Sequence, residues 1–150
     1  MTLEQIIRNG ILANAGVAAL LGTNLFLVQL PEDAFDPASN PPGGKPPDAP
    51  TARAVYQRIS TQRFYAHASA NDVGWSVFRL TIWDYTGIST LNIAQAIVAA
   101  LATFTAQLDD SPPSPNAPNF VLNQRMDVEP QTSPPLFKTV MDVRFFFEDQ

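Results

Sequence analysis

Proline placement is the feature that most restricts how this chain can fold. All 14 prolines fall into three clusters, with seven in residues 31–50, four in 112–118 and three in 130–135. Because proline fixes φ and lacks a backbone N–H, these stretches are not expected inside a helix or a central strand. Residues 31–50 therefore predict a 20-residue loop, and loops of that length usually serve a function or are disordered. Regular structure must lie between the clusters.

Hydrophobic periodicity predicts two long helices. Residues 2–14 have Thr2 followed by Gln5, the pattern of a capping box, and an apolar face made of Leu3, Ile6, Ile7 and Ile11. A short helical turn is expected at 17–21. The second long helix is predicted to begin at Ser89 or Thr90 and to end before Asp109, with an apolar face made of Ala94, Ile97, Val98, Leu101, Phe104 and Leu108.

Alternating apolar residues predict five strands, at 24–30, 52–60, 73–84, 119–129 and 137–148. In 73–84, Phe78, Leu80 and Ile82 share one face. The other face carries Trp75, Val77 and Trp83 beside Arg79 and Thr81, so we expect packing on both sides. In the last strand, one set is expected to point inward and one outward: Phe137, Met141, Val143, Phe145 and Phe147 inward; Lys138, Asp142, Arg144 and Glu148 outward.

The predicted order of elements is α-β-β-β-α-β-β. Consecutive strands with few crossover helices indicate an α+β fold, in which helices pack on one face of a mainly antiparallel sheet. The length of 150 residues suits a single domain spanning 1–150, with long Pro-rich loops at 31–50 and 109–119. The longest apolar stretches, around 11–21 and 93–102, are too short to span a membrane, so no membrane contact is expected.

The residues that usually carry chemistry are scarce. The chain has no cysteine and one histidine, His67, which leaves no thiolate nucleophile and none of the usual zinc sites. Gly43-Gly44-Lys45 lacks the flanking residues of a phosphate-binding loop. Three acidic pairs are best interpreted as solvated charge: Glu32–Asp33, Asp109–Asp110 and Glu148–Asp149. We therefore predict no catalytic, cofactor or metal site, and no enzyme.

Charge further narrows the choice of partner. The net charge is −5, with nine Lys and Arg residues and no basic run, so a phosphate-binding face is not expected. Aromatic residues such as Tyr56 and Trp75 are better assigned to the core and to subunit contacts than to base stacking. Charged residues make up only 15% of the chain, against about 25% in typical soluble domains. This shortage indicates a surface that is either unusually poor in charge or partly covered, which is a first hint of a subunit rather than a free enzyme.

Several segments occur in an order that is characteristic of one family. The N-terminal helix leads to VAALLG, a strand reads VYQRIS, and FRLTIWDYT runs directly into LNIAQAIVAAL. The chain closes with VLNQRMDVEP and MDVRFFFED. In this layout, over about residues 3–148, the chain resembles the tail-completion proteins of long-tailed phages, also called tail terminators or tail-to-head joining proteins.

The resemblance implies a structural virion subunit. Such a subunit forms a homo-oligomeric ring, expected to be a hexamer, that caps the tail tube and presents a docking surface to the head connector or neck protein. It would be made in the host cytoplasm and lie at the head-proximal end of the tail, where DNA passes through the ring lumen without specific binding. Two alternatives stay open: another phage neck or connector subunit, or a small-molecule-binding or enzymatic α+β domain.

Six residues are candidates for subunit or partner contacts. They are Phe35 and Lys45 in the 31–50 loop, Arg53 and Arg58 on the 52–60 strand, and Asp109 and Asp110 in the 109–119 loop. Arginine is favoured at interfaces because its planar guanidinium offers several donors in a fixed fork. The alternative for Arg53 and Arg58 is that both simply lie on an exposed sheet face.

Overall fold

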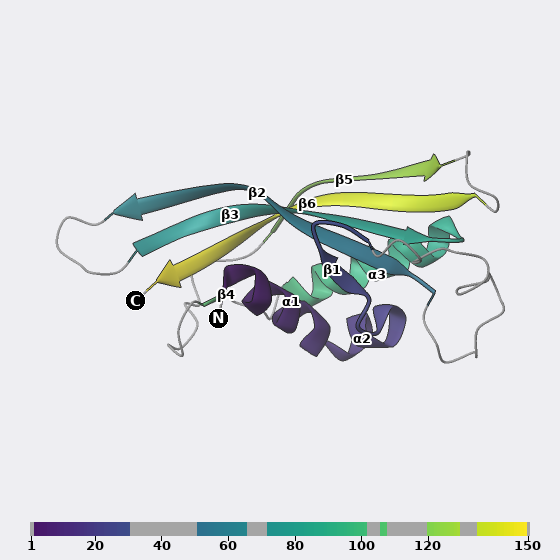
Figure 1. The fold of residues 1–150 in the computed structure, drawn as a ribbon, viewed down its shortest axis with the longest axis horizontal. Coiled ribbons are helices and arrows are strands. Elements are labelled where there is room, and N and C mark those ends of the chain that lie inside the picture. Colours follow the sequence, from purple (N-terminus) through teal and green to yellow (C-terminus); the bar gives the residue numbers. More distant parts are fainter. Residues whose placement is uncertain are drawn as a thin grey trace.

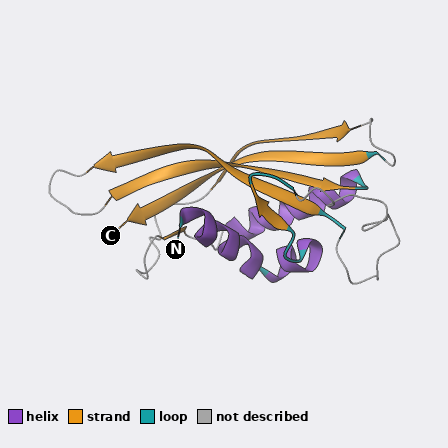
Figure 2. Cartoon of the chain, in the orientation of Figure 1, coloured by secondary structure: helices purple, strands orange, loops and turns teal. Residues whose placement is uncertain are grey.

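A computed structural model describes residues 2–30, 51–65, 72–101, 106–107, 120–129 and 135–149. In these segments three helices pack on one face of a six-stranded sheet (Figures 1 and 2). The predicted α+β class is confirmed. The elements are α1 (Leu3–Ala13), α2 (Ala15–Leu21), β1 (Leu25–Leu27), β2 (Arg53–Tyr65), β3 (Asp72–Asp84), α3 (Gly87–Leu101), β4 (Ala106–Gln107), β5 (Phe120–Glu129) and β6 (Leu136–Asp149).

The sheet is built around β3 and β6, which pair antiparallel along their whole lengths, from Asp72↔Asp149 to Asp84↔Phe137. On the far side of β3 lie β2, which is antiparallel, and then β1, which is short and parallel. On the far side of β6, β5 pairs antiparallel along residues 136–144 and β4 pairs parallel at 147–148. The sheet therefore ends at β1 on one side and at β5 and β4 on the other.

Local hydrogen bonds fix where the helices begin. The predicted capping box is present, because Gln5 N donates to Thr2 Oγ1 at 3.3 Å and Thr2 N donates to Gln5 Oε1 at 2.9 Å. The predicted cap of α3 was wrong: the helix begins at Gly87, and Thr86 Oγ1 accepts from Ser89 N at 3.3 Å. Ser89 and Thr90 thus lie in the first turn, where Thr90 Oγ1 donates to the Gly87 carbonyl at 2.8 Å.

The C-terminal end of α3 also differs from the prediction. The helix ends at Leu101, and residues 106–107 form the short strand β4 where a helix had been expected. Ala106 and Gln107 pair in parallel with Phe147 and Glu148 of β6, a contact distant in sequence that the helical periodicity does not reveal. Phe104 and Leu108 lie outside the described residues.

The hydrophobic core lies between the sheet and the helices. Phe78, Leu80 and Ile82 on β3 are fully buried, as the alternation predicted. The rings of Phe78 and Phe145 meet edge to face at 5.7 Å between centroids. Further fully buried side chains come from both layers: Ile7, Ile11, Leu21, Ile93, Ile97, Met141 and Val143. Burial of these alternating positions holds the helices against one face of the sheet.

The strand β2 is longer than predicted, because a bulge within it interrupts the alternation from which its length was predicted. Pairing with β3 passes from Arg58↔Phe78 to Ser60↔Val77, which leaves Ile59 as an extra residue. The bulge resets the alternation, so Tyr56 and Arg58 face the helices before it and Thr61 does so after it. The prediction ended the strand at residue 60, whereas β2 continues to Tyr65.

Candidate assembly surface

Arg53 lies at the start of β2 on the outer face of the sheet, which is the face opposite the helices. It pairs with Trp83 across the strands. Its Nη1 donates to the carbonyl oxygens of Thr51 and Ala52 at 3.1 and 3.0 Å, and the residue is 8% exposed. A buried guanidinium that donates to the backbone just before its own strand offers little area to a partner. Its role in an interface stays a prediction.

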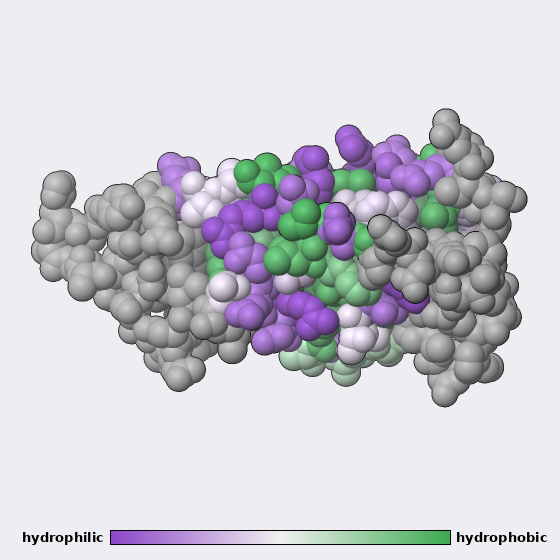
Figure 3. Space-filling view, viewed as in Figure 1, coloured by the Kyte–Doolittle hydropathy of each residue, from purple (hydrophilic) through white to green (hydrophobic). Residues whose placement is uncertain are grey.

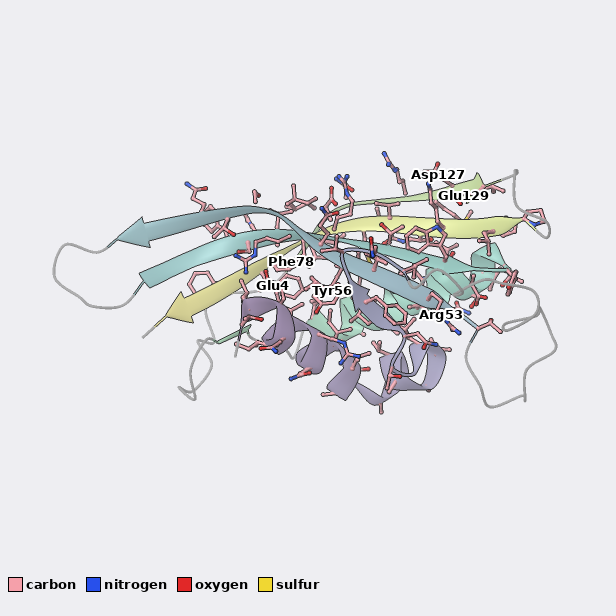
Figure 4. The ribbon with its side chains drawn as sticks, viewed as in Figure 1. Glu4, Arg53, Tyr56, Phe78, Asp127 and Glu129 are labelled. Carbon is pink, nitrogen blue, oxygen red and sulfur yellow. The ribbon has the colours of Figure 1, made fainter. Side chains whose placement is uncertain are left out.

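Arg58 points to the opposite face of β2, toward the helices. Its Nη2 lies 2.6 Å from Glu4 Oε1 of α1, and its guanidinium lies over the Phe78 ring at 5.7 Å from the centroid. Figure 4 shows Glu4 and Phe78 close together where α1 meets the sheet. Arg58 therefore helps to fasten α1 to β2. The two arginines do not share one face. They are five residues apart, and residues an odd number apart on a regular strand point to opposite faces.

The other four candidates cannot be placed. Phe35, Lys45, Asp109 and Asp110 lie outside the described residues, as do the 31–50 loop that holds the first two and His67. Their proposed part in assembly stays a prediction from the sequence.

A charged cluster on the outer face joins three strands. Asp142 of β6 accepts from Arg79 of β3 through both carboxylate oxygens, from Nε at 2.8 Å and from Nη2 at 3.0 Å. The side-chain amide of Asn123 on β5 donates to the same carboxylate at 3.0 Å. Asp142 was predicted to point outward and does so, but it is only 7% exposed. The hydrogen bond from Arg79 is the main cause that lowers the pKa of Asp142 below its usual value, and Asn123 adds to it.

The substitution Asp142→Asn should make stability less dependent on acid pH. At pH 7 we expect the free energy of unfolding to fall by about 1–2 kcal/mol, because a charge-assisted bidentate pair is lost. A carboxyl whose folded pKa is lowered stabilises the fold above its unfolded pKa of about 3.9, and this contribution is lost as the pH falls through the folded pKa. The difference in the free energy of unfolding between the variant and the wild type should therefore be smaller in acid than at pH 7, as measured by urea unfolding.

The matched control for this prediction is Asp127→Asn, because Asp127 is more exposed and its pair with Arg125 spans 3.5 Å. We expect a change within about 0.5 kcal/mol at either pH. A gap for Asp142→Asn that stays constant or widens in acid would contradict the assigned role of the carboxylate.

Exposed apolar side chains gather on β5. Every residue from Leu122 to Val128 is exposed, and Leu122, Met126 and Val128 are each 46–47% exposed. Met126 and Val128 lie on the side of β5 that faces the helices, opposite Thr139 and Phe137 of β6. The sulfur of Met126 would lie 3.1 Å from a Cβ at Gly87, so the start of α3 adjoins this strand.

We call Met126, Val128 and Ile88 the β5 patch. Ile88, beside Gly87 in α3, is 73% exposed, the largest value among the exposed hydrophobic residues of the described segments. On the opposite side of β5 are charged residues, among them Asp127 and Glu129, which Figure 4 shows far along the sheet from Glu4 and Phe78. In Figure 3, hydrophobic and hydrophilic residues are intermixed over the described middle of the face in view. An exposed apolar patch beside a charged strand face is typical of a protein interface.

The described segments were found to lack two features that would point to other functions. No helix there is long and apolar enough to cross a membrane. No group of three His, Cys, Asp or Glu residues there is arranged to hold a metal ion.

Comparison with known proteins adds a likeness of fold. No family model and no curated protein matches this sequence. Among solved structures, the fold is similar to a chain of the virion of a native gene transfer agent particle, with a TM-score of 0.55 and 13% sequence identity. The match covers 95% of this chain and 92% of that chain. The two chains therefore share a fold over nearly their whole lengths.

Proposed function

We propose that this chain is a structural subunit of a phage virion that forms a ring on the tail tube and joins the tail to the head. The observation that carries the proposal is the match of fold, over 95% of this chain, to a chain of a virion particle. A match that spans both chains concerns the whole domain rather than one shared motif. The sequence resemblance to tail-completion proteins points in the same direction.

The surface of the chain supports a role in assembly. Charged residues make up 15% of the sequence, and the cores of protein interfaces are depleted in charge. The β5 patch adds three exposed apolar side chains, at 47–73% exposure, two on the border strand β5 and one at the start of α3. A free monomer gains nothing from exposing such a corner, whereas a subunit gains stability when a neighbour covers it.

The proposed mechanism depends on shape rather than catalysis. Copies that contact each other head to tail close into a ring when the rotation between them returns to the start. One face of the ring would contact the tail tube and the other the head connector, and DNA would pass through the lumen. A net charge of −5 on each subunit disfavours retention of DNA. The residues proposed for these contacts are the six named from the sequence: Phe35, Lys45, Arg53, Arg58, Asp109 and Asp110.

Native mass spectrometry across a concentration series tests the proposal. A subunit weighs 16.4 kDa, so a hexameric ring would give a species of about 98 kDa. Electron microscopy of the same sample should show rings with a central opening. A monomer at every concentration, with no rings in the images, would contradict the proposal that copies of this chain close into a ring.

A further inference from the structure

The strand β5 is an open border of the sheet. Among the described strands it pairs with β6 only, so the N–H and C=O groups on its other side have no strand beside them. Proteins usually protect such an edge with lysine, proline or inward-pointing charge. Residues 120–129 contain neither lysine nor proline, and the side that faces the helices carries Gln124, Met126 and Val128, none of them charged. This border can therefore accept another strand.

A strand added to β5 would have to be apolar on the side that faces the helices. Residues opposite each other on neighbouring strands share a face and contact one another. Those opposite Met126 and Val128 would meet two side chains that are each 47% exposed. Apolar residues there would remove this exposed area from water, whereas a charged residue would lose its hydration without gaining a partner.

The other long open edge in the described segments, on β2, does not meet this requirement. The strand β1 pairs with β2 only as far as Tyr56, where Val28 has a φ of 71° and its N–H donates to the Tyr56 carbonyl at 3.0 Å. Beyond this point, residues 57–65 present Arg58 and Thr61 toward the helices. The strands β1 and β4 are only three and two residues long. Of the described edges, β5 alone is long and apolar on its helix-facing side, which selects a second copy of β5.

A two-fold axis perpendicular to the sheet brings two copies of β5 together. This rotation reverses the direction of the strand and keeps the helices of both copies on the same side of the joined sheet. The two strands are then antiparallel, and helix-facing residues meet helix-facing residues. With the axis at Met126, this residue lies opposite Met126 of the second copy, and Gln124 lies opposite Val128.

The outer face of β5 distinguishes this register from its neighbours. Axes at Arg125, Asp127 or Val128 would place like charges opposite each other, which is destabilising. Axes nearer the N-terminus would include the bulge at Leu122. The axis at Met126 puts Arg125 of each copy opposite Asp127 of the other. These two side chains already form a loose pair within the strand, at 3.5 Å and with 68% and 48% exposure, so they select the register while the apolar side drives association.

We propose that β5 pairs with β5 of a second copy about a two-fold axis at Met126. The pairing joins two sheets into one and brings the two β5 patches together on the helix side, where each covers the other. The contact is isologous and closes at two copies. It is therefore separate from the head-to-tail contacts of the proposed ring, and it does not depend on them.

Disulfide trapping tests the position of the axis, and the absence of native cysteine makes the result clean. In the proposed register, Met126→Cys lies opposite itself with Cα atoms about 4.5–5.5 Å apart, which a disulfide spans. Val128→Cys lies about 14 Å from its own counterpart, so it should not link alone but should link to Gln124→Cys in a mixture. All three positions are exposed.

Under mild oxidation we expect Met126→Cys to give roughly tenfold more linked dimer than Val128→Cys alone. Equal linking by the two variants, or stronger linking by Val128→Cys alone, would overturn the proposed register. In native mass spectrometry, a species of about 33 kDa is expected for the wild type. A hexamer whose Met126→Cys variant does not link would overturn this contact and leave the ring intact. A linked dimer without any larger species would support this contact and overturn the ring.

A charge swap provides a second test that needs no disulfide. Arg125→Asp places two aspartates opposite each other at both ends of the contact, so we expect the dissociation constant of the dimer to rise at least about tenfold. Adding Asp127→Arg restores opposite charges across the axis and should restore the affinity. Urea unfolding of one copy, measured where the protein is monomeric, should be nearly the same in both variants. A swapped variant that stays as weak as Arg125→Asp would overturn the pairing.

Discussion

The substitution Phe78→Ala is expected to lower the free energy of unfolding by about 3–5 kcal/mol. Phe78 lies on the central strand β3, is fully buried, and packs edge to face on Phe145 and stacked at 6.4 Å on Tyr56. Alanine would leave a cavity on the helix side of the sheet that these rings cannot fill by small movements. Because domains of this size are stable by about 5–15 kcal/mol, the variant would lose much of its stability.

Urea unfolding followed by tryptophan fluorescence measures this loss, because both tryptophans, Trp75 and Trp83, lie on the same strand as Phe78. Phe78→Leu keeps most of the volume and should cost less than half as much as the alanine variant. Gln95→Ala on the exposed side of α3 should change the midpoint little. A loss below about 1 kcal/mol for Phe78→Ala would contradict the packing described for the core.

Local signals in the sequence predicted most of the fold. The capping box at Thr2 and Gln5 involves residues three apart, and the alternation of Phe78, Leu80 and Ile82 needs only the period of a strand. Both could be predicted because the interacting groups are close in sequence. The predicted order of long elements is confirmed for the same reason.

The sequence-based predictions were wrong where a distant contact or an irregularity determines the local structure. Ser89 fits a cap by sequence, but its hydroxyl donates to Asp84, and Thr86 serves as the cap. The bulge at Ile59 breaks the alternation on which strand length was judged, so β2 was predicted too short. The same alternation places Arg53 and Arg58 on opposite faces, and the ion-pair partner of Arg58, Glu4, comes from a distant part of the chain.

The candidate surface was harder to predict than the fold. Met126 and Val128 alternate with Asp127 and Glu129, which is an ordinary strand pattern that predicts one covered side. Only the topology shows that β5 is a border strand and that its apolar side chains are about half exposed. The left-handed conformation of Val28 has no signal in the sequence, because glycine or asparagine would be expected there.

The double substitution Met126→Lys with Val128→Lys should prevent assembly while leaving the fold intact. Both side chains are 47% exposed in one copy, so lysine can extend into water without disturbing the core. In a contact between copies, the two ammonium groups would lose their water without gaining a partner. We expect association to weaken by at least about a hundredfold, as is typical when apolar residues central to an interface are replaced.

Native mass spectrometry of this variant should show a monomer at concentrations where the wild type is multimeric, with unchanged circular dichroism. The matched control is Gln95→Lys with Ala99→Lys, which adds the same charge on an exposed stretch of α3. That control separates a local effect on the β5 patch from the change in net charge, which would move from −5 to about −3 in both variants. Equal losses in the two variants would mean that charge alone weakens assembly. A multimer that survives in the β5 variant would show that the border formed by β5 is not where copies meet, because buried lysines there could not be tolerated.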